Sequence, residues 1–146
     1  MSLAAAACTL ALVTAGGLVT SNDAALAVPD WPLNWGRLVP PLEGGIRFEF
    51  AHRVLALLAA VLTAWLAVWI ETREPRPWMR RLAWWAVAAV FAQALLGGAV
   101  VKLIDPKVLA IAHASLAEIC FGFTVAVAAG FYGASRSSSR LGSRIS

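Results

Sequence analysis

Four long apolar runs dominate this sequence and limit the folds that it can adopt. They cover Leu3 to Thr20, about Phe48 to Ile70, Leu82 to about Ile104, and Val108 to about Tyr132. A helix needs about 20 apolar residues to cross a bilayer, and each run is near or above that length. Because a bilayer core offers no water to pair with backbone groups, each run is expected to form a helix. The sequence therefore predicts an all-α, polytopic membrane four-helix bundle.

The composition agrees with a membrane protein, since 60% of the residues are hydrophobic and 14% are charged. A soluble domain carries about 25% charged residues. The net charge of +4 comes from Lys and Arg that cluster beside the apolar runs, so the expected partner is a lipid bilayer and no nucleic acid is expected. The two cysteines, Cys8 and Cys120, lie inside apolar runs and are expected to pack as small apolar residues.

The connections between the runs differ in charge. Residues 71–81 hold four Arg, residues 134–146 hold three Arg in a Ser-rich setting, and residues 21–46 hold only one Arg. The positive-inside rule then places both termini in the cytoplasm and residues 21–46 outside a bacterial-type inner membrane. We expect residues 1–133 to form the transmembrane domain and residues 134–146 a disordered cytoplasmic tail. An Ala-Leu-Ala at 25–27 has the form of a signal-peptidase site, but no positive charge precedes the first run.

A faint internal repeat divides the chain into two helical hairpins. Gly16-Gly17 stands late in the first run and Gly97-Gly98 late in the third. Each pair is followed, in the next run, by one of the only two histidines, at intervals of 35 and 15 residues. The difference of 20 residues is the extra length of the first outer loop. The chain therefore has the pattern of two duplicated hairpins, which is known among membrane proteins.

The two histidines, His52 and His113, are the candidate metal ligands. Both lie a few residues into their helices, which places each imidazole roughly 6–9 Å below its helix start. Two histidines at matched depth on parallel helices of a bundle are suited to hold a haem iron from both faces. The alternative is that each ring only forms hydrogen bonds inside the bundle. Zinc is disfavoured because it takes three or four protein ligands and no clustered cysteine is present.

Three further polar residues surround His52 at the start of the second run. Arg53 and Arg47 are suited to bind haem propionates, because a guanidinium pairs bidentately with a carboxylate. The alternative for both is anchoring at the membrane interface. Glu49 is three residues before His52 and shares its helix face. It is either an ion-pair partner of Arg53 or a catalytic group, a general base or charge stabiliser, beside the haem edge.

Two other features stay open at this stage. Glu118 lies deep in the fourth run, and Gln93 of the third run is a candidate hydrogen-bond partner for it. An acid inside a membrane is functional by default, so a proton path and a neutral structural role are both considered. The outer loop 21–46 carries four Pro and two Trp, and a fixed turn at Asp30-Trp31-Pro32 is expected. Such a loop either covers the outer end of the bundle or lies at the lipid headgroups.

Several of these motifs occur together, in order, in one known family. The stretch GGLVTSNDAALAVPDWPLNWGRLVPPLEGGIRFEFAHR, followed by LLGG and HASLAE, resembles the haem A synthase family of cytochrome oxidase assembly enzymes. Members oxidise a ring methyl of haem O to the formyl group of haem A. By that resemblance, His52 and His113 are axial haem ligands. Glu49 matches the essential acid near the substrate methyl.

The resemblance also implies a half-length member of that family, acting as a homodimer or with a partner half. The expected cofactor is haem, as substrate haem O, as haem b, or as both, and an unidentified electron donor is implied. The outer loop lacks the cysteine pair of some members, and Glu118 stands where Gln is common. Two functions remain besides the enzyme: a bis-His electron-transfer cytochrome of b type, and a non-catalytic haem-binding assembly partner.

Overall fold

Four long helices form the chain in the computed structural model, which describes residues 1–34, 36–104 and 107–142, with side chains as far as Tyr132. The helices are α1 (Ser2–Ser21), α2 (Ile46–Arg73), α3 (Pro77–Lys102) and α4 (Lys107–Gly142). All four are long and apolar enough to cross a membrane, which confirms the predicted all-α architecture. Within the described ranges the only extended pairing is one isolated bridge, in the loop between α1 and α2.

The helices start and end close to the predicted limits, and the sequence explains most of the boundaries. Pro77 stands at the beginning of α3, where its missing N–H costs nothing and its fixed φ favours a helix. The candidate membrane span in α4 covers Lys107–Tyr132, and the helix continues to Gly142. The division into a membrane domain and a tail from residue 134 stays a prediction. Asp105 and Pro106, between α3 and α4, lie outside the described residues.

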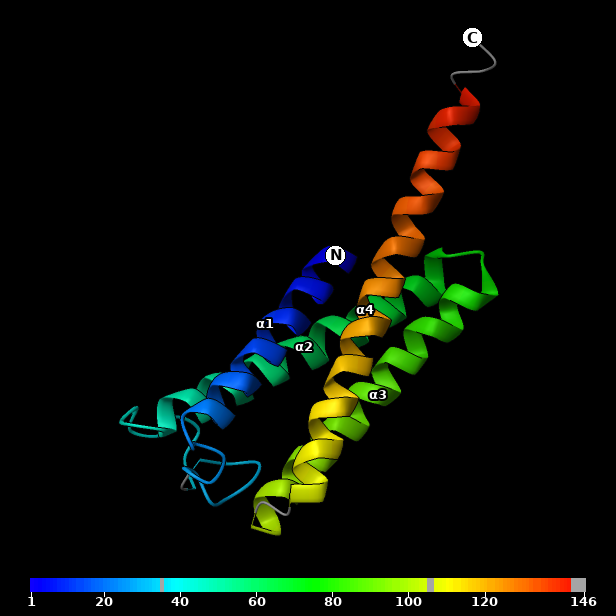
Figure 1. Cartoon of the computed structure of the whole chain (residues 1–146). Coiled ribbons are helices and arrows are strands. Elements are labelled where there is room, and N and C mark those ends of the chain that lie inside the picture. Colours follow the sequence, from blue (N-terminus) through cyan, green and yellow to red (C-terminus); the bar gives the residue numbers. More distant parts are fainter. Residues whose placement is uncertain (35, 105–106, 143–146) are drawn as a thin grey trace.

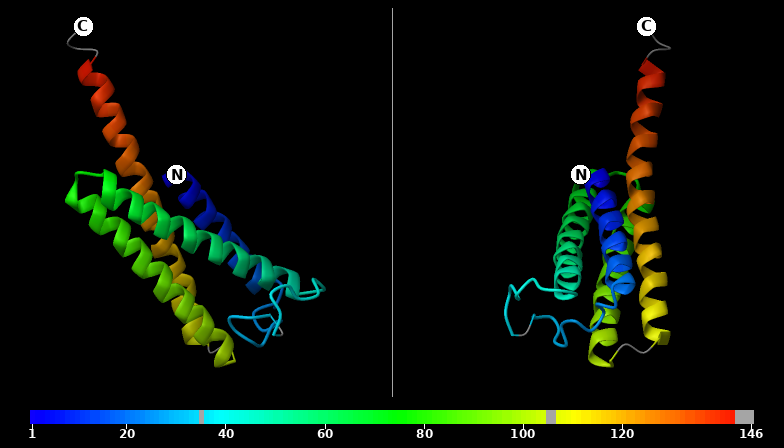
Figure 2. Two further views of the ribbon diagram at one scale, coloured as in Figure 1. Left: turned by 180° about the vertical axis from the view of Figure 1, so that it is seen from behind. Right: turned by 60° about the vertical axis from the view of Figure 1, so that its left-hand side comes forward.

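The bundle has a closed order in which each helix packs on the next. Packing joins α1 to α2, α2 to α3, α3 to α4 and α4 to α1, so α2 and α4 stand diagonally opposite. The two hairpins converge where α2 passes into α3 and diverge toward the other end, where the loop between α1 and α2 lies (Figures 1 and 2). The chain is thus a four-helix bundle of two hairpins.

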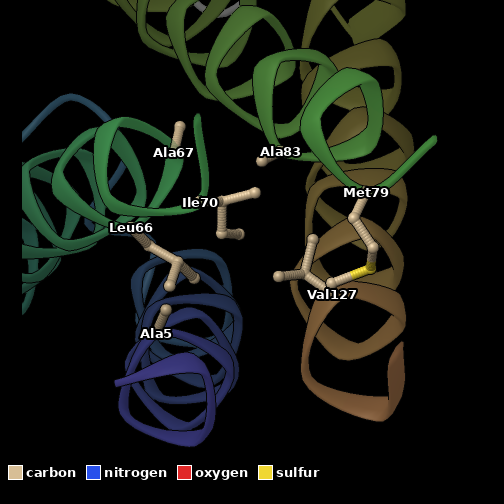
Figure 3. Close-up of a cluster of buried hydrophobic side chains, with 7 residues drawn as sticks. All are labelled: Ala5, Leu66, Ala67, Ile70, Met79, Ala83 and Val127. Carbon is tan, nitrogen blue, oxygen red and sulfur yellow. The ribbon is translucent and has the colours of Figure 1, made fainter. Parts of the chain in front are cut away.

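The best-packed apolar cluster lies at the convergent end. All four helices contribute to it (Figure 3). Its members are Ala5, Leu66, Ala67, Ile70, Met79, Ala83 and Val127. Ile70 and Met79 are completely buried. Small residues let the helix backbones approach closely here, which is how membrane helices gain packing energy without a hydrophobic driving force. The convergent end therefore holds the hairpins together.

The connection between α2 and α3 is fixed by an ion pair. The Glu74 carboxylate accepts from the Arg76 Nε at 2.6 Å and from Nη2 at 2.9 Å. Arg76 Nη1 also donates to the Gly130 carbonyl of α4 at 3.1 Å. These hydrogen bonds from Arg76 lower the pKa of Glu74 to about 2. The turn is therefore closed by its own ion pair and tied to α4.

Candidate functional site

The two histidines meet across the bundle from diagonal helices. His52 of α2 and His113 of α4 have ring centroids 6.5 Å apart, with the ring planes at 84°. Both side chains are half-buried. The Nδ1 atom of each ring is buried and has no hydrogen-bond partner within the part of the chain that the structure describes. A buried Nδ1 atom without a partner on each of two neighbouring rings is unusual in a packed bundle, because buried polar atoms are normally paired.

Each histidine ring rests against the first glycine of a Gly-Gly pair. A Cβ added to Gly16 would lie 3.2 Å from Cε1 of His52. A Cβ added to Gly97 would lie 2.9 Å from Cε1 of His113. Gly17, by contrast, has nothing within 4 Å of an added Cβ. The same packing therefore occurs in both hairpins. In each, a glycine on the first helix leaves room for the histidine ring of the second.

This arrangement fits a haem iron held from both sides. Two imidazole–metal bonds of about 2.0–2.1 Å on opposite sides of an ion place the ring centres roughly 6.3 Å apart. The observed separation of 6.5 Å agrees with that value. No group of three or more His, Cys, Asp or Glu side chains able to hold a bare metal ion occurs among the described residues. If haem is bound here, His52 and His113 would hold its iron and the macrocycle would supply the remaining ligands, as in bis-imidazole haem proteins.

Glu49 is buried one helical turn before His52. Only 4% of its surface is exposed. Its Oε2 accepts a hydrogen bond from the Val28 N–H at 2.8 Å, and its Oε1 forms an ion pair with Arg53. Both carboxylate oxygens therefore have a fixed donor, and the predicted pairing of Glu49 with Arg53 is present.

Arg53 connects the outer loop to α2. Its Nη1 donates to the Leu33 carbonyl at 2.6 Å and to Oδ1 of Asn34 at 3.2 Å. Its Nη2 donates to the Val28 carbonyl at 3.2 Å as well as to Glu49. Since a guanidinium has five N–H donors, only the Nε of Arg53 remains for another ligand. Arg53 thus acts as the anchor of the loop.

The outer loop also reaches the second hairpin. A Cβ added to Gly98 of α3 would lie 2.9 Å from the Trp31 ring. The loop is therefore held by Arg53 on α2 and packs on α3 through Trp31. This position at the divergent end agrees with a covering loop. Arg47 is exposed, and its guanidinium lies 4.8 Å from the Phe48 ring centre, so it takes no part in this network.

Gln93 and Glu118 do not meet as the sequence led us to expect. Gln93 Nε2 donates to the backbone carbonyl of His113 at 2.8 Å, and its Oε1 is buried without a partner among the described residues. Glu118 is exposed on the outer surface of α4. The pairing proposed from the sequence is therefore wrong. Gln93 stands four residues before Gly97, on the same helix face, and this spacing was the signal that connects it to His113.

Comparisons with known proteins identify the family of this chain. The family model described as cytochrome oxidase assembly protein matches residues 1–125. The heme A synthase of Symbiobacterium thermophilum is 33% identical over 129 residues, which are 87% of this chain and 42% of the relative. Those of Chelativorans sp. and Methylobacterium radiotolerans are 32% and 36% identical, over 76% and 70% of this chain.

The chain spans less than half the length of these curated relatives, from 31% to 42%. No solved structure matches the chain significantly. The family model nevertheless covers more than half of the chain and includes both histidines and Glu49. The chain therefore belongs to the family of cytochrome oxidase assembly proteins.

Proposed function

We propose that this chain is a membrane oxidoreductase that converts haem O to haem A for cytochrome oxidase assembly. One observation carries the proposal: His52 and His113 lie with ring centres 6.5 Å apart across the bundle. Relatives that are similar over most of this chain are named heme A synthase. When bound, haem O would supply the methyl group that is oxidised; the four electrons lost in forming the formyl group would pass to an oxidant from outside this chain, and dioxygen or water would supply the oxygen atom.

His52 and His113 are the proposed axial ligands. They approach one another from the diagonally opposite helices α2 and α4. Gly16 and Gly97 fix where each imidazole lies, because the rings rest against the two glycine backbones. Gln93 holds the backbone at His113 from α3. The site is therefore shaped by α1 and α3 as well as by the two helices that carry the ligands.

Glu49 is the proposed catalytic residue. Its carboxylate lies on the same face as His52 and is fixed by Val28 and Arg53, so it presents oriented oxygens at low mobility. In that position it stabilises positive charge at the reacting carbon or accepts a proton from it. Arg53 acts by holding Glu49 and the loop. Arg47, which is exposed and outside this network, is the freer cation for a haem propionate.

A second candidate is a bis-His electron-transfer cytochrome of b type. The ion pair between Glu49 and Arg53 favours it, because a loop anchor needs no catalytic carboxylate. Such a protein would hold haem b through the same two histidines. The two functions therefore differ at Glu49 and agree at the ligands.

The decisive experiment identifies the haem that the purified protein carries. We expect mass analysis of the extracted haem to give haem O, a hydroxylated product or haem A. Glu49→Gln keeps an acceptor for the Val28 N–H and loses the charge, so it should retain haem and stop conversion. Glu118→Gln, a matched change on the exposed surface of α4, should convert normally. If the protein carries haem b alone, and cells with Glu49→Gln form as much haem A as before, the proposed enzymatic activity is contradicted.

The ligand assignment has its own test. His52→Ala and His113→Ala should each remove the bis-imidazole absorption spectrum of the bound haem. An unchanged spectrum in either variant rejects that residue as a ligand. A second copy or another four-helix unit as partner, an electron donor, and cytoplasmic termini in a bacterial-type inner membrane remain predictions of the same proposal. Cross-linking in membranes and cysteine accessibility from each side test the partner and the orientation.

A further inference from the structure

An open groove lies at the opposite end of the bundle from the histidines. Its volume is about 520 Å³ and it is lined by Glu71, Pro77, Arg80, Arg81, Trp84 and Trp85. These residues come from the last turns of α2 and the first turns of α3, where the two helices meet (Figure 1). Because the candidate membrane spans of α2 and α3 end and begin here, we expect the groove at the depth of lipid headgroups.

The charges around the groove are not all compensated. Arg80 donates through Nε to the Glu74 carbonyl at 2.7 Å and lies 3.9 Å from a Glu71 carboxylate oxygen. The other Glu71 oxygen accepts from the Trp84 indole at 2.9 Å. Arg81 is exposed, and no hydrogen bond or ion pair is found for it within the described part of the chain. Arg81 thus presents an unpaired guanidinium at the groove.

Two tryptophans stand beside this cation. Trp84 is 46% exposed and Trp85 is 61% exposed. Tryptophan favours the headgroup level, where its ring contacts the glycerol and upper acyl region while its N–H finds a polar partner. The Trp84 indole already has such a partner in Glu71. The cation can contact the phosphate of a phospholipid, and the adjacent aromatic rings can contact its acyl chains.

We propose that this groove binds an anionic phospholipid, with the phosphate at Arg81 and the glycerol and upper chains against Trp84 and Trp85. Basic pockets between membrane helices are suited to anionic headgroups, and each basic residue near the surface contributes binding energy. Glu71 does not oppose the phosphate strongly, because its carboxylate is already engaged by Trp84 and Arg80. The inference is independent of the haem site.

Native mass spectrometry of the detergent-purified full chain tests the proposal. The protein is mixed with equal amounts of phosphatidylglycerol and phosphatidylcholine of identical chains, and retained lipid is counted. We expect phosphatidylglycerol to be preferred, and Arg81→Gln to reduce that preference about fivefold. Arg73→Gln is the matched control, since Arg73 is exposed at the end of α2, near the start of α3 that carries Arg81, and does not line the groove. It should leave the preference unchanged.

Three results would overturn the proposal. Equal losses in Arg81→Gln and Arg73→Gln would indicate unspecific attraction to a basic surface. Displacement of the lipid by inorganic phosphate at equal concentration would indicate a site for a free anion. If long-chain and dihexanoyl phosphatidylglycerol were retained equally, and Trp85→Ala did not change the retention of either, the lipid would not contact the tryptophans as proposed. Unchanged thermal midpoints in the variants verify that each one folds.

Discussion

Gly97→Ala is the sharpest test of the proposed ligand geometry. The added Cβ would lie 2.9 Å from Cε1 of His113 and 3.4 Å from its Nε2. Carbon atoms in favourable contact are about 3.5–4.0 Å apart, so the overlap is at least about 0.6 Å. The helix backbone of α3 cannot yield easily, since it packs on both α2 and α4. The His113 ring must therefore move.

The size of the effect follows from two opposing terms. Alanine in a helix interior is about 0.8–1.0 kcal/mol more favourable than glycine. Overpacking of a tight contact costs about 1–3 kcal/mol. The net change in stability of the haem-free chain is therefore small, because the ring can turn aside. In the haem-bound state the ring is fixed, and the full overpacking cost lowers haem affinity by about 5- to 150-fold.

Haem titration of the purified variants, followed by Soret absorbance, measures this loss. Gly16→Ala should have a smaller effect than Gly97→Ala, because its Cβ would lie 3.2 Å from the nearest His52 atom. Gly17→Ala should bind haem like the wild type and unfold about 1 kcal/mol less readily, since nothing lies within 4 Å. If Gly97→Ala binds haem as tightly as Gly17→Ala with an unchanged spectrum, the reasoning is refuted.

Three further predictions concern stability and the outer loop. Ile70→Ala should lower the free energy of unfolding in detergent by about 2–5 kcal/mol. Leu57→Ala, at a side chain that is 68% exposed, should lower it by about 0.5 kcal/mol or less. Similar losses in the two variants would reject the assigned core. Arg76 lowers the pKa of Glu74 from 4.5 to about 2, so this ion pair contributes its full stability above pH 4.5 and loses it as the pH falls toward 2. The thermal midpoint of the wild type should therefore decrease through that range, and Glu74→Gln should lack this part of the decrease. Arg53→Lys cannot make four separate hydrogen bonds, so limited proteolysis should cut the loop at residues 22–45 faster, and an unchanged cleavage rate would contradict its role as anchor.

The sequence predicted the helices well because one physical requirement dominates them. Each apolar run has to satisfy its own backbone in a bilayer, so its length and its charged flanks nearly determine where the helix lies. The predicted second run began at Phe48, and α2 begins at Ile46. The repeat of Gly-Gly and His could also be predicted. Its two intervals differ only by the extra length of the loop between α1 and α2, which indicates two similar hairpins.

The partners of the polar side chains were harder to predict, because they depend on how the helices are arranged in space. Gln93 was assigned to Glu118 by depth alone, but its amide reaches the backbone of His113, and Glu118 lies on the outer surface. For Arg53, a propionate contact, interfacial anchoring and pairing with Glu49 were all considered; the pairing is present, and the folded loop adds carbonyls at Val28 and Leu33 that the sequence did not indicate. Depth along a helix follows from the sequence, whereas the direction of a side chain follows from packing.

The two hairpins share their histidines and glycines but not their acid. Three residues before His113 stands Ala110, at the position that Glu49 has relative to His52. The residue after His113 is also alanine, where the first hairpin has Arg53. Among the described residues, a ligand held between the two imidazoles would therefore meet a fixed carboxylate on the α2 side, beneath the loop that Arg53 anchors. In the proposed site the duplicated features would hold the iron symmetrically, and the unduplicated ones would make its two faces chemically different. A pure electron carrier has no need of that difference, which is why Glu49, more than either histidine, decides between the two candidate functions.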